Sequence, residues 1–201
     1  MFDAKLRPII DPPLNYCGKK LAGLGLTANQ ITIAGAVIGV AAGFAIANSQ
    51  FLFGLILVLS SRIFDGLDGA IARATKNTDF GGYLDIMCDF IFYLAIPIGF
   101  AFSSSGNLVP SLLLISSFTL TGISFLAYAT LAEKNRLETN AHGTKSFFYN
   151  TGIAEGAETI FIFVIMCVFP NKFAIIAYAY TAVCVLTVFQ RTFIARRMFH
   201  N

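Results

Sequence analysis

Six long apolar stretches constrain this chain more than any other feature of its sequence. They cover about residues 30–48, 51–72, 83–103, 108–131, 153–169 and 173–194. A membrane-spanning helix needs about 20 predominantly apolar residues, and the helix satisfies its backbone hydrogen bonds within the segment. The pattern therefore predicts an all-α polytopic membrane protein with six transmembrane helices, built by residues 1–201 as a single domain.

The composition agrees with a membrane protein and argues against several other classes. Of the 201 residues, 56% are hydrophobic and only 12% are charged, whereas soluble domains carry about 25% charged residues. The net charge of +3 is small and dispersed, which argues against a nucleic-acid partner. The four cysteines are far apart in the sequence, so we expect neither a disulfide framework nor a zinc site.

The distribution of charge predicts the orientation in the membrane. All Lys and Arg residues except Lys172 fall on or near the side that carries the N-terminus, and all 11 carboxylates fall towards the same side. No apolar signal segment is visible before the first stretch. Under the positive-inside rule both termini are cytoplasmic, and any chemistry based on the carboxylates faces the cytoplasm.

The residues before the first apolar stretch predict a helix that lies on the membrane. Between residues 13 and 25, apolar residues recur at helical spacing with Lys19 and Lys20 between them, which predicts an interfacial amphipathic helix. Thr27 and Gln30 then form a capping-box pattern that starts the first transmembrane helix. Asn29 and Thr32 either help to begin that helix or face a ligand.

Four aspartates form two pairs at helical spacing. Asp65 and Asp68 share one face of the second apolar helix, and Asp85 and Asp89 share one face of the third. The link between the two helices is short, so they are antiparallel neighbours and their acidic faces can meet at the membrane boundary.

Carboxylates held this close need cations to offset their repulsion. Oxygen ligands at this density suit Mg²⁺ or Mn²⁺, and four carboxylates offer enough ligands for two such ions. Gly66 and Gly69 suggest close approach by a ligand, and Arg73 offers a positive group for a phosphate. The alternative is that these aspartates only mark a helix end.

The spacing Asp65-x-x-Asp68-Gly69-x-x-Ala72-Arg73, then seven residues, then Gly81-x-x-x-Asp85-x-x-x-Asp89 resembles the signature of the CDP-alcohol phosphotransferase family, also called CDP-alcohol phosphatidyltransferases. The match extends to every defined position. Arg62, three residues before the first Asp, is also common in that family. Residues 142–159 most resemble small, poorly characterised bacterial inner-membrane members.

The resemblance implies an enzyme of phospholipid biosynthesis that transfers a phosphatidyl group from CDP-diacylglycerol to a small alcohol and releases CMP. It implies that Asp65, Asp68 and Asp85 bind Mg²⁺ or Mn²⁺, and that Asp89 is both a metal neighbour and the general base. The implied CDP-lipid site comprises Gly69, Ala72, Arg73, Gly81, Asn29 and Thr32. It further implies a homodimer in the bacterial inner membrane.

The acceptor site is less constrained by the sequence. Lys145, Glu155, Glu158 and Arg191 are the candidate acceptor residues, because they lie in or near the cytoplasmic ends of the last two apolar stretches. A phosphorylated acceptor favours the cations, an amino alcohol favours the glutamates, and a neutral polyol can use both. Alternatively, the glutamates pair with the cations and only hold helices together.

Two other classes of protein remain open from the residues alone. An intramembrane prenyltransferase also uses Asp-rich magnesium sites, but such enzymes usually repeat the acidic motif, and this chain has one copy. A cation carrier needs acids along a path through both leaflets, whereas the predicted outer halves of these stretches carry none.

Overall fold

The computed structural model describes residues 3–135 and 152–199, and every regular element in these ranges is helical. The elements are α1 (Asp3–Gly23), α2 (Ala28–Ala47), α3 (Phe51–Ala74), α4 (Asp79–Ser103), the 3₁₀ helix η1 (Ser105–Asn107), α5 (Leu108–Lys134), α6 (Gly156–Val168), the 3₁₀ helix η2 (Pro170–Lys172) and α7 (Phe173–Phe199). The all-α class is therefore confirmed.

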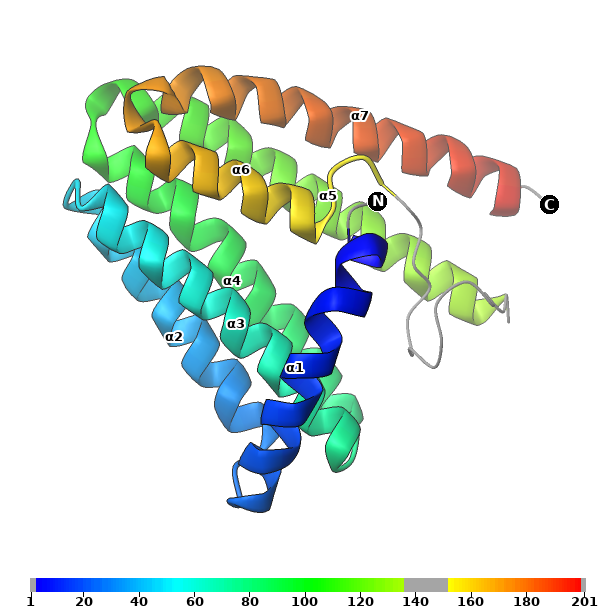
Figure 1. The fold of residues 1–201 in the computed structure, drawn as a ribbon. Helices are drawn as coiled ribbons and strands as arrows, with labels where there is room; N and C mark the ends of the chain where they lie inside the picture. The colour runs from blue at the N-terminus through cyan, green and yellow to red at the C-terminus, as the bar shows by residue number, and fades with distance from the viewer. Residues whose placement is uncertain (1–2, 136–151, 200–201) are drawn as a thin grey trace.

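The long helices converge at one end of the molecule and diverge at the other (Figure 1). The α2–α3 turn, η1 and η2 lie together at the converging end. From there α2, α3 and α4 run side by side, whereas α5 and α7 run together in a different direction. The carboxyl half of α3 and the amino half of α4, which carry the four aspartates, lie at the diverging end.

The first helix is longer than the sequence indicated. We expected a helix over residues 13–25 from the spacing of its apolar residues, but α1 begins at Asp3 and contains Pro8, Pro12 and Pro13. It ends before Gly25, whose φ of +85° is accessible to glycine at little cost. The helix crosses α3, and its predicted location in the headgroup layer stays a prediction.

Glycines on one face of α2 allow close packing against α3 and α4. A Cβ on Gly35 would lie 3.1 Å from Phe64 Cβ, and one on Gly43 would lie 2.5 Å from the backbone oxygen of Ala95. Between them, a Cβ on Gly39 would lie 2.8 Å from the ring of Phe92. Small residues four apart let membrane helices approach closely, and here they bring α3 and α4 to the same face of α2.

Aromatic side chains join α4 to the later helices. Phe163 of α6 packs edge-on against Phe92 of α4 and Phe118 of α5, with ring centroids 5.8 and 5.9 Å apart. Phe118 in turn contacts Tyr180 of α7. These residues are buried in one core, to which α4, α5, α6 and α7 all contribute.

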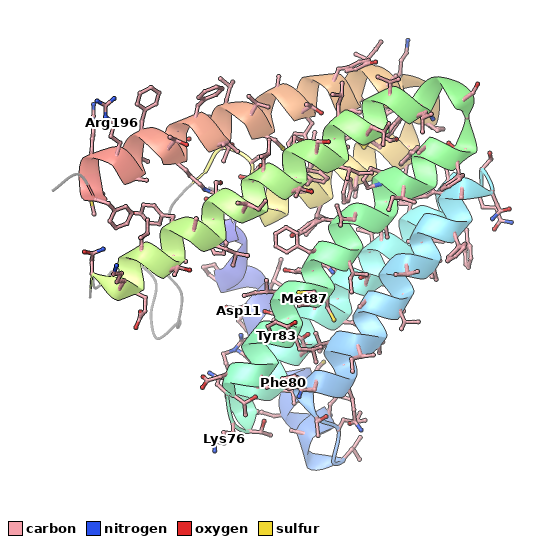
Figure 2. All side chains as sticks on the ribbon, turned by 180° about the vertical axis from the view of Figure 1, so that it is seen from behind. Asp11, Lys76, Phe80, Tyr83, Met87 and Arg196 are labelled. Atoms are coloured by element: carbon pink, nitrogen blue, oxygen red, sulfur yellow. The ribbon has the colours of Figure 1, made fainter. Side chains whose placement is uncertain are left out.

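Within the described ranges, four helical segments are long and apolar enough to cross a membrane: 28–47, 79–103, 105–134 and 170–199. Each predicted stretch contains a helix, but the count of six transmembrane helices is not confirmed. Helix α3 is 24 residues long but carries Arg62, Asp65 and Asp68, and α6 has only 13 residues. Phe80, Tyr83 and Met87 form an exposed stripe along α4 (Figure 2), as expected for a face in contact with lipid.

Candidate active site

Three aspartates from two helices form a group that suits a metal ion. One carboxylate oxygen from each of Asp65, Asp68 and Asp85 lies within 4.8 Å of the others. Asp65 and Asp68 come from the last turns of α3, and Asp85 comes from the second turn of α4. The predicted meeting of the two acidic faces is thus present in the structure.

Asp68 provides an independent reason to place a cation there. Its side chain is 5% exposed, and its Oδ2 atom is buried without a hydrogen-bond partner among the described residues. A buried carboxylate oxygen without a donor is costly. A divalent ion bound by oxygen ligands would remove that cost, so the donor set fits Mg²⁺ or Mn²⁺.

The fourth aspartate has a different partner. Arg62 of α3 donates a hydrogen bond from Nη1 to Asp89 Oδ1 at 2.7 Å, and the same nitrogen lies 3.7 Å from Asp65 Oδ1. Asp89 lies one helical turn after Asp85. Arg62 therefore makes ion pairs with Asp89 and with Asp65 of the group of three, and the shorter contact is the one with Asp89.

A small pocket contains both parts of this arrangement. It is lined by Thr32, Gly35, Ala36, Arg62, Asp65, Asp68, Cys88 and Asp89. Thr32 and the aspartates were predicted from the sequence, but Gly35, Ala36 and Cys88 were not. A signal for two of these was present, because Gly35 and Ala36 follow Thr32 by three and four residues and so share its helical face.

The two motif glycines have different neighbours. A Cβ on Gly66 would lie 2.7 Å from Leu14 Cδ1 of α1, so this glycine makes room for a neighbouring helix, and the approach of a ligand there stays a prediction. A Cβ on Gly69 would lie 3.2 Å from Arg73 Nη1 of the same helix. Ala72 is half-buried one turn after Asp68.

Arg73 also contacts α1. Its Nε and Nη2 atoms both donate to Asn15 Oδ1, at 3.2 and 2.9 Å. The side chain is exposed and lies at the end of α3. Asn15 was not singled out from the sequence, since no local spacing connects residues 58 positions apart.

Asn29 and Gly81 lie next to one another. A Cβ on Gly81 would lie 3.3 Å from Asn29 Oδ1 and 3.0 Å from the hydroxyl of Thr78. Thr78 caps α4 by accepting a hydrogen bond from the Gly81 amide at 3.0 Å. These polar groups therefore extend the site from the aspartates towards the start of α4.

The acceptor candidates are distributed differently. Lys145 lies outside the described residues. Arg191 is buried, and its Nη1 donates to the Thr121 carbonyl at 2.9 Å and to Ser124 Oγ at 3.3 Å. Glu155 accepts a hydrogen bond from the Gly152 amide at 3.0 Å. Arg191 therefore joins α7 to α5 in this geometry.

Glu158 lies in the first turn of α6, and the amino end of this helix faces α4. A Cβ on Gly156 would lie 3.2 Å from the hydroxyl of Tyr93, which is one turn after Asp89. The start of α6 is thus close to the helix that carries two of the aspartates.

The described residues form helices, four of them apolar enough to span a membrane, and a group of carboxylates that includes the buried Asp68; these are the features of an integral membrane protein with a candidate metal site. Residues 25–194 match the family model described as CDP-alcohol phosphatidyltransferase. The chain belongs to the CDP-alcohol phosphatidyltransferase family and is an enzyme of phosphatidyl transfer in phospholipid synthesis.

Two curated relatives match almost the whole chain. Inner membrane protein YnjF of Escherichia coli (strain K12) is 41% identical over 192 residues, which are 95% of this chain and 93% of the relative. Archaetidylinositol phosphate synthase of Pyrococcus horikoshii is 36% identical over 196 residues, which are 96% of each chain.

Solved structures share the fold. Phosphatidylinositol phosphate synthase of Mycobacterium tuberculosis with CDP-DAG bound is 21% identical and superposes with a TM-score of 0.74 over 91% of this chain and 93% of that one. The same enzyme in complex with manganese and citrate is 22% identical, with a TM-score of 0.72 over 89% of this chain and 87% of that one.

Proposed function

We propose that this enzyme transfers a phosphatidyl group from CDP-diacylglycerol to a small alcohol and releases CMP. One observation supports this proposal most directly. Carboxylate oxygens of Asp65, Asp68 and Asp85 lie within 4.8 Å of one another, beside the pocket that Asp89 lines. Family membership favours this reaction over a prenyl transfer or cation transport. The CDP-DAG and manganese in the M. tuberculosis structures support the same choice of donor and metal class.

The three grouped aspartates would hold two Mg²⁺ or Mn²⁺ ions, with Asp89 as their neighbour. When bound, such ions draw charge from phosphoryl oxygens and from the leaving group. Asp89 acts as the general base. Its carboxylate takes the proton of the acceptor hydroxyl while the hydroxyl oxygen bonds to the lipid-linked phosphorus and the bond from that phosphorus to CMP breaks.

Other residues around the pocket bind the donor. Thr32 and Asn29 on α2, with Gly81 at the start of α4, form the polar side of the proposed CDP site. Gly69 and Ala72 leave room beside it, and Arg73 offers a positive charge to the diphosphate. The bond from Arg73 to Asn15 holds the guanidinium near the end of α3.

A phosphorylated polyol is the first acceptor class to test. Its support is the relative named archaetidylinositol phosphate synthase, which matches 96% of this chain. Of the two cations considered, Arg191 already donates to the Thr121 carbonyl. It can bind an acceptor phosphate only through the part of its guanidinium that this contact leaves available.

The experiment is an acceptor screen with purified enzyme and labelled CDP-diacylglycerol. Phosphorylated polyols, free polyols and amino alcohols are added separately, CMP is quantified, and the lipid product is identified by mass. We expect CMP only with the correct acceptor class, and none in excess EDTA. Full turnover in EDTA, or in Asp65→Asn, would remove the metal-dependent mechanism.

We also propose that the enzyme is a homodimer in a bacterial inner membrane with its active site facing the cytoplasm. The inner-membrane relative supports the membrane, and the distribution of Lys and Arg supports the orientation. Light scattering in detergent, corrected for bound detergent, measures the mass directly. A mass of one chain at working concentration would exclude the dimer.

A further inference from the structure

Arg62 is the charged residue that connects the two parts of the carboxylate cluster. We propose that Arg62 is a positioning residue for Asp89, holding that carboxylate in the pocket beside the group of three. The inference rests on the proposed role of Asp89 as base, and it adds a residue to which the family signature in this chain assigns no function.

The guanidinium of Arg62 is held on several sides. Nη1 donates to Asp89 Oδ1 at 2.7 Å, and Nη2 donates to Ser61 Oγ at 3.3 Å. The central carbon of the guanidinium lies 3.8 Å from the centre of the Phe92 ring. An arginine is suited to these contacts because its planar group stacks on a ring and donates in fixed directions at the same time.

The supports of Arg62 are themselves fixed by packing. Ser61 is fully buried and donates to the Gly35 carbonyl at 2.8 Å. Phe92 is also fully buried, in the core that includes Phe163. A side chain on Gly39 would collide with Phe92 and crowd Ser61, so the glycine face of α2 preserves the position of both supports.

This arrangement gives the four carboxylates different roles. Asp85 and Asp89 are one turn apart on the same face of α4, so their spacing alone does not separate a metal ligand from a base. The hydrogen bond from Arg62 restrains Asp89. The Asp89 side chain is 32% exposed and still lines the pocket. A fixed carboxylate matters because misplacement of a catalytic group by about 1 Å can cost about 10²-fold in rate.

The competing interpretation is that Arg62 only offsets the charge of the carboxylates when no cation is bound. In that case Arg62 would release Asp89 when metal binds, and its removal would change metal affinity more than turnover. The two interpretations therefore predict different effects on the same variants.

The test is a double-mutant cycle between Arg62→Met and Asp89→Asn. Arg62→Met alone should lower kcat by about 10²-fold with little change in the KM for CDP-diacylglycerol, and its affinity for Mn²⁺ alone should be unchanged or tighter. The double variant should be no slower than Asp89→Asn, because Arg62 acts through that residue. Arg62→Lys, which keeps the charge, should recover part of the rate.

A second measurement does not depend on activity. In EDTA, the two single variants should each lower the melting temperature, and the double variant should lower it by less than the sum, because both remove the same contact. If Arg62→Met does not fold, Ser61→Ala weakens the support of Arg62 and should give a smaller loss of kcat. Arg196→Met, at the far and exposed end of α7 (Figure 2), is the control for removal of one positive charge.

The inference fails if Arg62→Met turns over at the wild-type rate while Asp89→Asn is slow, or if the two effects multiply in the double variant. It also fails if Arg62→Met loses metal affinity in proportion to kcat. A wild-type rate in Asp89→Asn instead removes the base assignment in the proposed function, so the two failures are distinguishable.

Discussion

At the scale of single residues, Asp68 shows how the proposed metal site would conflict with stability. Its Oδ2 atom is buried without a hydrogen-bond partner among the described residues, close to oxygens of Asp65 and Asp85. Like charges at short distance repel, and burial increases the cost. The residue is therefore unfavourable in the metal-free protein and useful only when a cation is bound.

We expect Asp68→Asn to have opposite effects on stability and activity. Removing one charge should stabilise the metal-free protein by about 1 kcal/mol, whereas losing one ligand should weaken Mn²⁺ binding by about 10-fold or more and lower CMP release. The measurements are thermal unfolding in EDTA and turnover with metal.

Asp79→Asn is the matched control for that variant. Asp79 is exposed in the first turn of α4, so its removal should leave turnover unchanged and cost only a few tenths of a kcal/mol through the helix dipole. Unchanged metal affinity in Asp68→Asn would contradict the assignment of Asp68 as a ligand.

Sequence spacing was sufficient to predict the aspartates and insufficient to predict their neighbours. Positions three or four apart share a helix face whatever the tertiary structure, so both acidic pairs were predictable. The contact of Gly66 with Leu14 was not predicted, because a missing side chain leaves space without indicating which group fills it. Asn15 and Arg62 act through contacts 58 and 27 residues away along the chain, which no local pattern encodes.

At the scale of helices, α1 is attached to α3 by three adjacent contacts. A Cβ on Gly18 would lie 2.7 Å from Ala70 Cβ and 2.9 Å from its backbone carbon. Leu14 packs on Gly66, and Asn15 accepts hydrogen bonds from Arg73. Helix α1 therefore contacts the carboxyl-terminal half of α3, which carries two of the aspartates.

We expect Gly18→Ala to separate α1 from α3. Overpacking against backbone atoms typically costs about 1–3 kcal/mol, and the loss of the contact with Arg73 should weaken CDP-diacylglycerol binding. Gly23→Ala is the matched control, since a Cβ there meets no atom of the described residues within 4 Å. Equal melting temperatures and equal CDP-lipid affinities for the two variants would show that α1 does not need this contact.

Helix α2 makes a closer approach to α4. A Cβ on Gly43 would lie only 2.5 Å from the Ala95 carbonyl oxygen, and a backbone oxygen cannot move without its helix. We expect Gly43→Ala to destabilise the protein by about 3 kcal/mol, measured by thermal unfolding. In Gly106→Ala the nearest atom would be Ser104 Oγ at 3.9 Å, so this variant should unfold like the wild type. A normal melting temperature for Gly43→Ala would mean that α4 can shift.

Helix positions were more predictable than helix ends. The capping box of Thr27 and Gln30 is confirmed, with hydrogen bonds of 3.0 and 3.3 Å. The start of α4 was placed four residues too late, because the apolar pattern begins after Thr78 has already capped the helix. Polar first turns such as this one carry no apolar signal.

At the scale of the whole molecule, the turns at the converging end should lie on one side of the membrane and the aspartates towards the other. We expect a cysteine at Gly106 to react with a membrane-impermeant reagent from outside intact cells, and a cysteine at Lys76 to react only after lysis. Cys17 is exposed and must first be replaced by serine. Labelling of Lys76→Cys in intact cells would reverse the orientation.

The divergence of the helices was not predictable from the apolar stretches. Their lengths indicate how many helices there are, but not their angles, which depend on contacts such as those of Phe163 with Phe92 and Phe118. The same contacts bring the amino end of α6 towards Tyr93, one turn from Asp89. The proximity of α6 to the aspartates therefore depends on tertiary packing.

The short length of α6 has a consequence for the lipid around the enzyme. Its 13 residues extend about 20 Å, whereas the hydrocarbon layer is about 30 Å thick. With its carboxyl end at one surface, its amino end stops about 10 Å below the other, beside the helix that carries Asp85 and Asp89. In that placement the bilayer would thin locally beside the aspartates, and the proposed alcohol acceptor and lipid-linked donor could meet there without either leaving its own phase.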